Sequence, residues 1–361
     1  MRSCVCLSLS MVLISTASSA QVGGVDLVYK AAADWLKLPE GRTDIGSMHG
    51  DVAVSSSGDV YISVEGSVLQ RYAIIGPNPG LQVYHSGGAF LHNVPHAPSD
   101  LHGFIIRKEP DGEFIYGIRF AGGPTEAEQT RVGLNTQVII KMTLDGQIVM
   151  AIPASAVPVQ FQNRTDDGRP FMRLTAMAVA SNGDLYVSDG SASDYIHRFD
   201  RNGKYLASFG GRKDPYGFET LHEIAIDTRF NPERIIASDR AHNRVVHLTL
   251  EGALLGVFAK DLQLPGGIAI SGEYVAIAEL QGQVSILDKT GNVVARIGTN
   301  TATDQGGLQG NRTEPSKWRP GIVTAPHGVA FNDRGDLFVA EFSLWGRVHR
   351  FNLQRGGTDS R

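Results

Sequence analysis

Cysteine is almost absent from this sequence of 361 residues, which contains only Cys4 and Cys6. Both lie in residues 1–20, where a basic residue, a short apolar run and a stretch of small residues follow one another. This is the pattern of a secretory signal peptide cleaved after Ala20, so we expect a mature chain over residues 21–361 without any thiol. Disulfides, a thiolate nucleophile and cysteine-bound metals are thereby excluded, and any chemistry must come from histidine, carboxylate, tyrosine, arginine or serine side chains.

Long apolar runs and clusters of basic residues are also missing. The apolar run of the leader, residues 5–14, is too short to span a bilayer. The 33 Lys and Arg residues and 37 Asp and Glu residues give a net charge of −4 without a basic run, so neither nucleic acid nor an anionic membrane surface is indicated as a partner. We therefore expect an exported monomer, periplasmic or extracellular, without a membrane span in the mature chain and with a small molecule or a peptide as its substrate.

Glycine, in contrast, is abundant, and much of it falls in a repeated pattern of strand, turn and strand. The chain has 42 glycines and 16 prolines, which suit many tight turns. Each repeat joins a short apolar strand to a second β-rich strand through a turn that often contains Gly-Asp. Copies occupy residues 50–63, 102–117, 175–189, 222–239, 266–279 and 326–341. Several copies continue into two further strands.

These repeats predict an all-β, six-bladed β-propeller that forms a single domain. Four short antiparallel strands make a blade, and blades stacked around an axis bury both faces of each sheet. We expect residues 25–30 to add an outer strand that closes the ring against the sixth blade. Insertions rich in Gly, Pro, Asn and Thr are predicted to be surface loops around the mouth of the central funnel, at residues 73–100, 120–137, 155–171 and 299–323.

The first strand of each blade lies nearest the axis, so the first residues of these strands form an inner ring. Its members are Gly50, His102, Thr175, His222, Gly266 and His327. The three histidines fall on blades two, four and six, and three converging imidazoles with an open coordination position are typical of a catalytic zinc site. Alternatively, each histidine merely forms a hydrogen bond at a strand start. His49 is a second-choice ligand, because it lies one residue before the slot and one residue reverses the face of a strand unless a bulge intervenes.

A second ring, mostly acidic, comes from the ends of the second strands, which return to the same end of the blades. It contains Glu65 or its neighbours, Asp189, Asp239, Glu279 and Glu341, with Arg119 near the equivalent place in blade two. Such carboxylates often bind the backbone N–H groups of nearby loops, and this structural role competes with a catalytic one. At Asp239 the next residue is Arg240, and an arginine beside a metal can hold a substrate carboxylate through two hydrogen bonds.

Over the whole mature chain, these motifs resemble the bacterial NHL-repeat propellers that look like the peptidyl-α-hydroxyglycine α-amidating lyase family. Residues 34–41 resemble the segment that leads those propellers. Three elements resemble those whose histidines bind zinc in the lyase, and two others match strand ends of the family: Leu101-His102-Gly103, Leu221-His222-Glu223, Pro326-His327-Gly328, Val187-Ser188-Asp189-Gly190 and Ala237-Ser238-Asp239-Arg240.

The family lyase cleaves a C-terminal α-hydroxyglycine to a peptide amide and glyoxylate. The resemblance implies a zinc ion that acts on the substrate hydroxyl, a base that takes its proton, and an arginine that holds the substrate carboxylate. Two positions depart from the family. The tyrosine that follows Ser-Asp-Gly in the family corresponds to Ser191 here, which leaves Tyr195 as a substitute. The arginine that the family has in the first blade corresponds to Glu65. A carboxylate at that place repels a substrate carboxylate, so a lyase or hydrolase with another substrate fits equally well.

Three classes of function remain open from the sequence. The first is a metal-dependent lyase with zinc held by residues from the set His102, His222, His327 and His49, and with Arg240, Tyr195, Glu65 and Asp239 as catalytic candidates. The second is a non-catalytic propeller that binds a peptide or a glycan. The third is a lactonase-type hydrolase with calcium bound by carboxylates and asparagine near the axis, which the histidine-rich inner ring disfavours.

Overall fold

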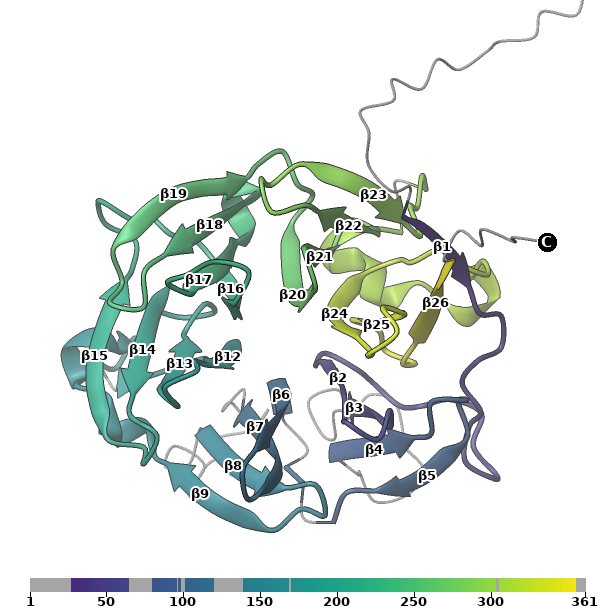
Figure 1. The fold of residues 1–361 in the computed structure, drawn as a ribbon, viewed down its shortest axis with the longest axis horizontal. Helices are drawn as coiled ribbons and strands as arrows, with labels where there is room; N and C mark the ends of the chain where they lie inside the picture. Colours follow the sequence, from purple (N-terminus) through teal and green to yellow (C-terminus); the bar gives the residue numbers. More distant parts are fainter. Residues whose placement is uncertain are drawn as a thin grey trace, which may run out of the picture.

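The computed structural model describes residues 27–64, 80–95, 97–98, 101–119, 139–168, 170–302 and 305–354. These residues form six four-stranded antiparallel sheets around a central axis (Figure 1). The six-bladed β-propeller predicted from the repeats is confirmed.

In the first five blades, the strands run outward from the axis in sequence order. Blade one contains β2 (Val52–Val54), β3 (Val60–Val64), β4 (Gly80–Tyr84) and β5 (Phe90–Asn93). Blade two contains β6 (Leu101–Glu109), β7 (Gly112–Arg119), β8 (Ile139–Thr143) and β9 (Ile148–Ile152). Blade three contains β12 (Ala176–Val179), β13 (Leu185–Ser188), β14 (Tyr195–Phe199) and β15 (Tyr205–Gly210).

The second half of the ring repeats this arrangement. Blade four contains β16 (Leu221–Asp227), β17 (Arg234–Asp239), β18 (Arg244–Leu248) and β19 (Leu254–Ala259). Blade five contains β20 (Pro265–Ser271), β21 (Tyr274–Glu279), β22 (Gln283–Leu287) and β23 (Val293–Ile297). Blade six contains β24 (Pro326–Phe331), β25 (Leu337–Glu341), β26 (Val348–Gln354) and, as its outer strand, β1 (Val28–Ala31).

The first strand of the chain closes the ring on the last. β1 runs antiparallel to β26, with Val28 opposite Gln354 and Ala31 opposite Phe351. The closing strand predicted for residues 25–30 is therefore confirmed, with its described part beginning at Val28. Pairing the first strand with the last joins the two ends of the described chain in one sheet and so closes the ring.

Connections between strands contain the few helical turns and one small hairpin. They are η1 (Ala154–Ala156), η2 (Val159–Phe161), η3 (Arg240–His242), η4 (Gly307–Arg312), η5 (Pro315–Lys317) and the pair β10 (Asn163–Arg164) with β11 (Pro170–Phe171). Over the described ranges, we find no helix with the length and apolar character needed to cross a bilayer.

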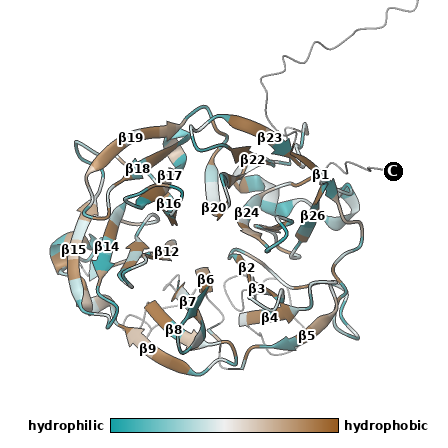
Figure 2. Ribbon diagram, viewed as in Figure 1, coloured by the Kyte–Doolittle hydropathy of each residue, from teal (hydrophilic) through white to brown (hydrophobic). Residues whose placement is uncertain are grey.

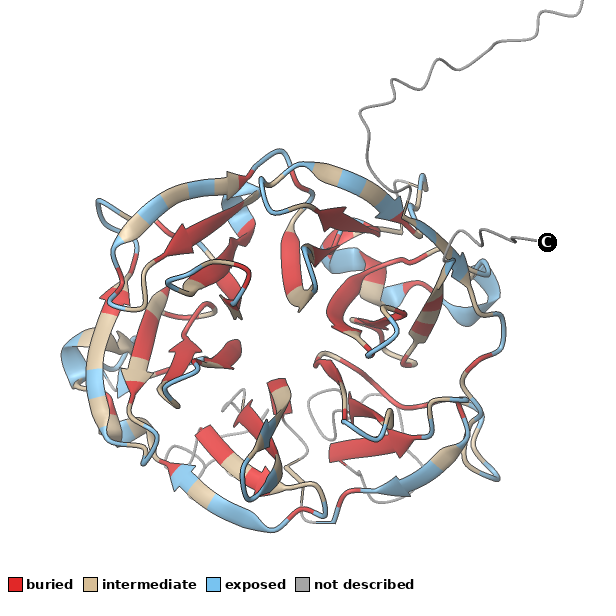
Figure 3. Cartoon of the chain, viewed as in Figure 1, coloured by how far each residue is buried: buried red, intermediate tan, exposed pale blue. Residues whose placement is uncertain are grey.

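Apolar side chains fill the space between neighbouring blades. One cluster joins Ile118 and Ile139 of blade two to Val187 and Phe199 of blade three. The inner strands are mostly buried, whereas partly buried and exposed positions alternate along outermost strands such as β19 and β23, which are largely apolar (Figures 2 and 3). Each blade thus depends on its neighbours to cover its faces, and this stacking gives the axial ends of the inner strands fixed positions.

The inner strands of four blades begin with a β-bulge. Their register with the second strand shifts at Leu101/Phe104, Leu221/Ile224, Pro265/Ile268 and Pro326/Gly328. The bulged segments contain the inner-ring residues His102, His222, Gly266 and His327. A bulge changes the direction of a side chain relative to the regular alternation of the strand, and here it releases the three histidines from the blade faces.

Candidate metal centre

Four histidines from different blades meet at one end of the axis. The rings of His102 and His222 lie 5.1 Å apart, those of His102 and His327 4.9 Å, and those of His222 and His327 4.8 Å, measured between centroids. The ring of His49, which precedes β2, lies 4.8 Å from His102 and 5.0 Å from His327. The structure therefore brings together all four histidines that the sequence suggested as ligands.

The nitrogen atoms of this cluster are arranged as metal ligands usually are. Donor nitrogens of His49, His102 and His327 lie within 4.8 Å of one another. Nδ1 of His102 lies 2.7 Å from the carbonyl oxygen of Thr175, and Nδ1 of His327 lies 3.1 Å from that of Gly50. A carbonyl can only accept, so Nδ1 carries the proton and the ring lone pair is on Nε2. Metal-binding histidines commonly have this backbone contact, which fixes the tautomer and the ring orientation.

Two ring nitrogens of the cluster are buried without a hydrogen bond to any described residue: Nδ1 of His222 and Nε2 of His327. A buried polar atom without a partner costs about 1–3 kcal/mol. A divalent cation among the rings would offset this cost, and a set of imidazole nitrogens suits zinc better than calcium, which prefers oxygen ligands. The residues present therefore fit a zinc ion.

Burial keeps these imidazoles neutral, which is the form that binds a metal. His102, His222 and His327 are 2–3% exposed. Desolvation is the largest cause that holds the pKa of each ring well below its usual value, and the neighbouring imidazoles and the charge of Arg240 lower it further. The cluster thus has lone pairs available at neutral pH, while the identity of a bound ion stays a prediction.

His49 joins the cluster because its segment pairs with blade six instead of continuing β2. Met48 donates its N–H to the carbonyl oxygen of Ser343 at 2.8 Å, and Ser343 donates back to Met48 at 2.9 Å. The ring of His49 then packs on Phe342, with the centroids 4.2 Å apart. Strand alternation made His49 a second choice, but alternation does not apply outside a strand. Phe342 was not predicted as part of this site.

Arg240 places a buried cation beside the histidines. It begins η3 directly after β17, is 8% exposed, and donates from Nε to the carbonyl oxygen of Pro265 at 3.4 Å. A Cβ added to Gly266 would lie 3.0 Å from Nη2, so the absence of a side chain in the inner ring of blade five makes room for the guanidinium. Nη2 is buried without a hydrogen bond to the described part of the chain. Burial lowers the pKa of Arg240 to about 9.

Two buried carboxyl groups that the sequence did not single out lie next to this layer. Asp51 and Glu223 line an axial cavity of about 380 Å³ whose other walls, apart from Thr228, are apolar side chains of the inner strands. Burial raises the pKa of Asp51 to about 8, and burial together with the charge of Asp51 raises that of Glu223 well above its usual range. Both groups therefore favour the neutral form, and the attraction between Glu223 and Arg240 opposes the effect of burial only in part.

Asp239 has a structural role in this fold, so its prediction as a catalytic residue is not supported by its contacts. Its carboxylate accepts hydrogen bonds from the backbone N–H of Glu219 at 3.0 Å and from Arg244 Nε at 2.7 Å, and it contacts Nδ1 of His242 at 3.0 Å. Equivalent bonds to the segment before the inner strand are made by the acids of other blades: Asp189 to Arg173, Glu279 to Gln263 and Glu341 to Thr324. The acidic ring fastens loops, as the structural alternative proposed.

Tyr195 also lies away from the cluster. It begins β14, the third strand of blade three, and its ring packs edge-on against Phe161 at 5.2 Å. Third strands are separated from the axis by two inner strands, so this position does not bring the phenol to the histidines. The contacts of Tyr195 therefore do not support it as a substitute for the family tyrosine, and that role stays a prediction. Glu65 lies outside the described residues.

Comparisons with known proteins agree with the resemblance inferred from the sequence. No family model matches the chain. A curated protein of Caenorhabditis elegans, "Probable peptidyl-alpha-hydroxyglycine alpha-amidating lyase", is 28% identical over 128 residues, which are 35% of this chain and 33% of that protein. The match thus spans about a third of the length of that relative.

Solved structures with the same architecture show the fold alone, because their identity to this chain is low. Virginiamycin B lyase from Staphylococcus aureus has a TM-score of 0.54 at 14% identity and covers 91% of this chain and 100% of its own. A gluconolactonase from Xanthomonas campestris has a TM-score of 0.56 at 11% identity and covers 86% of this chain and 88% of its own. Propellers of this shape thus include proteins named as lyases and as lactonases.

Proposed function

We propose that this chain is a metal-dependent lyase that cleaves a carbon–nitrogen bond in a small substrate or peptide end carrying a carboxylate. One observation carries the proposal: a cluster of buried, neutral histidines lies beside a buried guanidinium whose Nη2 has no hydrogen bond to the described residues. The cluster suits a cation such as zinc, and the guanidinium suits an anion. Their juxtaposition fits a substrate with a metal-binding oxygen and a carboxylate.

The partial match to an amidating lyase suggests an α-hydroxyglycine end as the substrate. In that reaction the bond between the amide nitrogen and the α-carbon breaks, the hydroxyl becomes a carbonyl, and the hydroxyl proton moves to the nitrogen. The products are a peptide amide and glyoxylate, and no oxidant or reductant is required. A metal bound by the histidines would supply Lewis-acid polarisation of a substrate oxygen.

The chain's own residues supply positioning and proton transfer in this proposal. Arg240 holds the carboxylate, and its burial makes the charged hydrogen bond stronger than it would be in water. We assign His102, His222 and His327 as the ligands, because all three are buried and come from alternate blades, whereas His49 is partly exposed. His49, the partly exposed histidine of the four, is then left to carry the proton from the hydroxyl to the nitrogen.

The test is turnover of a short α-hydroxyglycine peptide, followed by the release of glyoxylate. We expect wild-type turnover that is lost on chelation and restored by zinc. Arg240→Met should lower kcat/KM by about 10- to 100-fold, because it removes a charged hydrogen bond worth about 1.5–3 kcal/mol. Arg296→Met is the matched control, since Arg296 is an exposed side chain of β23.

If Arg240→Met were as active as wild type, Arg240 would not hold the substrate carboxylate. A protein that holds the metal but releases no glyoxylate would contradict the lyase assignment for this substrate. In that case, binding of the unreacted peptide, measured by calorimetry, would support the alternative of a non-catalytic binding propeller.

A further inference from the structure

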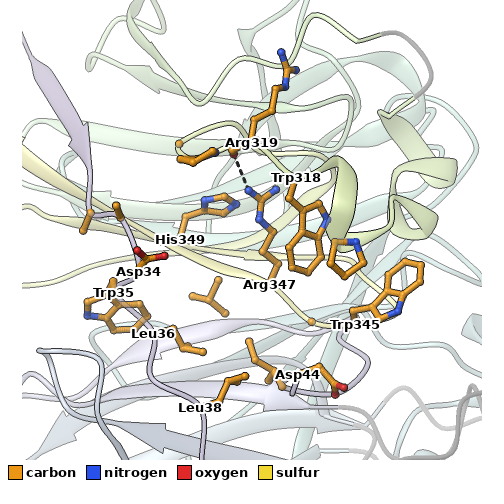
Figure 4. Close-up of a pocket in the computed structure, with 18 of the residues that line it drawn as sticks. Asp34, Trp35, Leu36, Leu38, Asp44, Trp318, Arg319, Trp345, Arg347 and His349 are labelled. Atoms are coloured by element: carbon orange, nitrogen blue, oxygen red, sulfur yellow. Dashed lines mark hydrogen bonds between the residues drawn. The ribbon is translucent and has the colours of Figure 1, made fainter. Parts of the chain in front are cut away.

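A second cavity lies between blades six and one, away from the axis, and has a volume of about 430 Å³ (Figure 4). All three tryptophans of the chain line it: Trp35, Trp318 and Trp345. None of the four axial histidines is among its lining residues. Pockets of roughly 300–1,000 Å³ with aromatic walls and a few polar groups are typical of sites for small ligands.

The cavity is built by the closure of the ring. Trp35 belongs to the segment after β1, Asp44 to the segment before β2, and Trp345 to the connection between β25 and β26. That connection starts where β25 ends, at the end of blade six where β24 begins with Pro326, directly before His327. The pocket and the axial centre therefore share a face of the propeller, and the paired segments around Met48 and Ser343 run between them.

The aromatic walls are held in place before any ligand arrives. Nε1 of Trp35 donates to the carbonyl oxygen of Ser86 at 2.8 Å, and Nε1 of Trp318 donates to that of Thr313 at 3.0 Å. The guanidinium of Arg347 lies 4.8 Å from the ring centroid of Trp318 and donates to the carbonyl oxygen of Arg319 at 2.8 Å. A ligand that stacks on these rings therefore loses little binding free energy to the ordering of side chains.

Groups of both charges line the cavity. Asp34 and Asp44 contribute two carboxylates and Arg347 contributes a guanidinium, whereas the guanidinium of Arg319 points away from the cavity and donates to Oδ1 of Asn300 at 2.6 Å (Figure 4). A ligand with both donors and acceptors can use groups of both kinds. His349 also lines the cavity, but its Nε2 is engaged by Glu341 at 2.6 Å.

We propose that this tryptophan pocket binds a neutral oligosaccharide, independently of the proposed metal chemistry. A sugar ring combines an apolar C–H face, which packs on an indole face, with hydroxyl groups that both donate and accept hydrogen bonds. The partly exposed indole rings of Trp318 and Trp345 supply the stacking surfaces, the carboxylates accept from hydroxyl groups, and the guanidinium of Arg347 donates to them. The occupant is thus a carbohydrate chain at a site beside, and distinct from, the axial cluster.

Intrinsic fluorescence tests the proposal directly, because every tryptophan of the protein lines the pocket. The full-length mature protein is titrated with maltotriose, cellotriose and the trimer of N-acetylglucosamine, and at least one should give a saturable change in tryptophan emission. Calorimetry with that sugar should show binding at least tenfold weaker for Trp318→Ala and for Trp345→Ala. Leu255→Ala, which alters an exposed apolar residue of β19, is the control and should bind as wild type does.

Parallel titrations separate the alternatives. The fluorescence response should persist in protein treated with a chelator, so failure of the metal centre and failure of this pocket are distinguishable. A saturable change in tryptophan emission on addition of choline or of a proline-rich peptide, with no change on addition of the sugars, would overturn the assignment of a carbohydrate. No response to any of these probes, or unchanged sugar affinity in both tryptophan variants with native circular dichroism, would overturn the site itself.

Discussion

Burial alone shifts the titration of an imidazole strongly in this protein, and His197 shows it away from the axial centre. This residue lies in β14, is fully buried, and its Nδ1 is 2.8 Å from the Ser208 hydroxyl oxygen. Desolvation lowers the pKa of His197 to about 3, from an ordinary value near 6.5. Between these two values the unfolded chain binds a proton that the folded chain does not, so stability falls as the pH falls.

We predict that His197 accounts for about 2 kcal/mol of lost unfolding free energy between pH 7 and pH 5. Replacing it with glutamine removes the titrating group, so the pH dependence of urea unfolding should be flatter in His197→Gln than in wild type over this window. His92→Gln, at an exposed position of β5, should keep the wild-type slope. An identical slope for His197→Gln would show that this imidazole does not titrate as its burial indicates.

At the scale of the element, the bulge at the start of an inner strand has two effects. It turns one residue toward the axis, and it brings the backbone of the following residue close to the inner strand of the next blade. A Cβ added to Gly103 would lie 2.6 Å from the carbonyl oxygen of Thr175, and one added to Gly267 would lie 2.4 Å from that of His327. Glycine at these positions lets neighbouring inner strands pack tightly. Glu223 takes the corresponding place in blade four, and its side chain lines the axial cavity instead.

Gly267→Ala should therefore lower the unfolding free energy by about 1–3 kcal/mol, since the added methyl group forces backbone shifts in a packed core. Because the shift falls on β24 at His327, metal affinity should fall as well. Urea unfolding and a zinc titration measure the two effects. Gly87→Ala, at an exposed turn, is the control and should change neither the unfolding free energy nor the zinc affinity. If Gly267→Ala were as stable as wild type, the inner strands would accommodate the methyl group without a loss of stability.

At the scale of the whole molecule, a metal held by residues from β6, β16 and β24 would tie blades two, four and six to one point. An ion that binds only the folded ring stabilises it by mass action, by about 2.7 kcal/mol at one hundred times the dissociation constant. We predict one zinc per chain by elemental analysis and a fall in melting temperature on chelation.

The same measurement distinguishes the ligands within the histidine cluster. His222→Ala should lose both the zinc and the response to chelator, while His49→Ala should keep both. The reverse result would assign the ion to His49, His102 and His327, whose donor nitrogens also lie within reach of one another. Full zinc retention in the double variant His222→Ala, His327→Ala would show that the ion does not bind to this cluster.

The repeats of the sequence were sufficient to predict the blades, the closing strand and the convergence of His102, His222 and His327. The reason is that strand periodicity and turn spacing are local, and a ring of equal units turns equivalent sequence positions into neighbours around one axis. The same reasoning assigned Arg240 to the mouth of the funnel, because it follows directly from the end of a second strand.

Contacts between segments that no repeat relates were decided only by the tertiary structure. His49 enters the cluster because Met48 pairs with Ser343, and Arg240 reaches the axis because Gly266 leaves room for it. Tyr195 fails to reach it, since a third strand stands away from the axis. Trp35, Trp318 and Trp345 share a pocket because the ring closes between blades six and one. Spacing along the chain carries no signal for such pairings, which arise from the way irregular segments fill the space left by the packed blades.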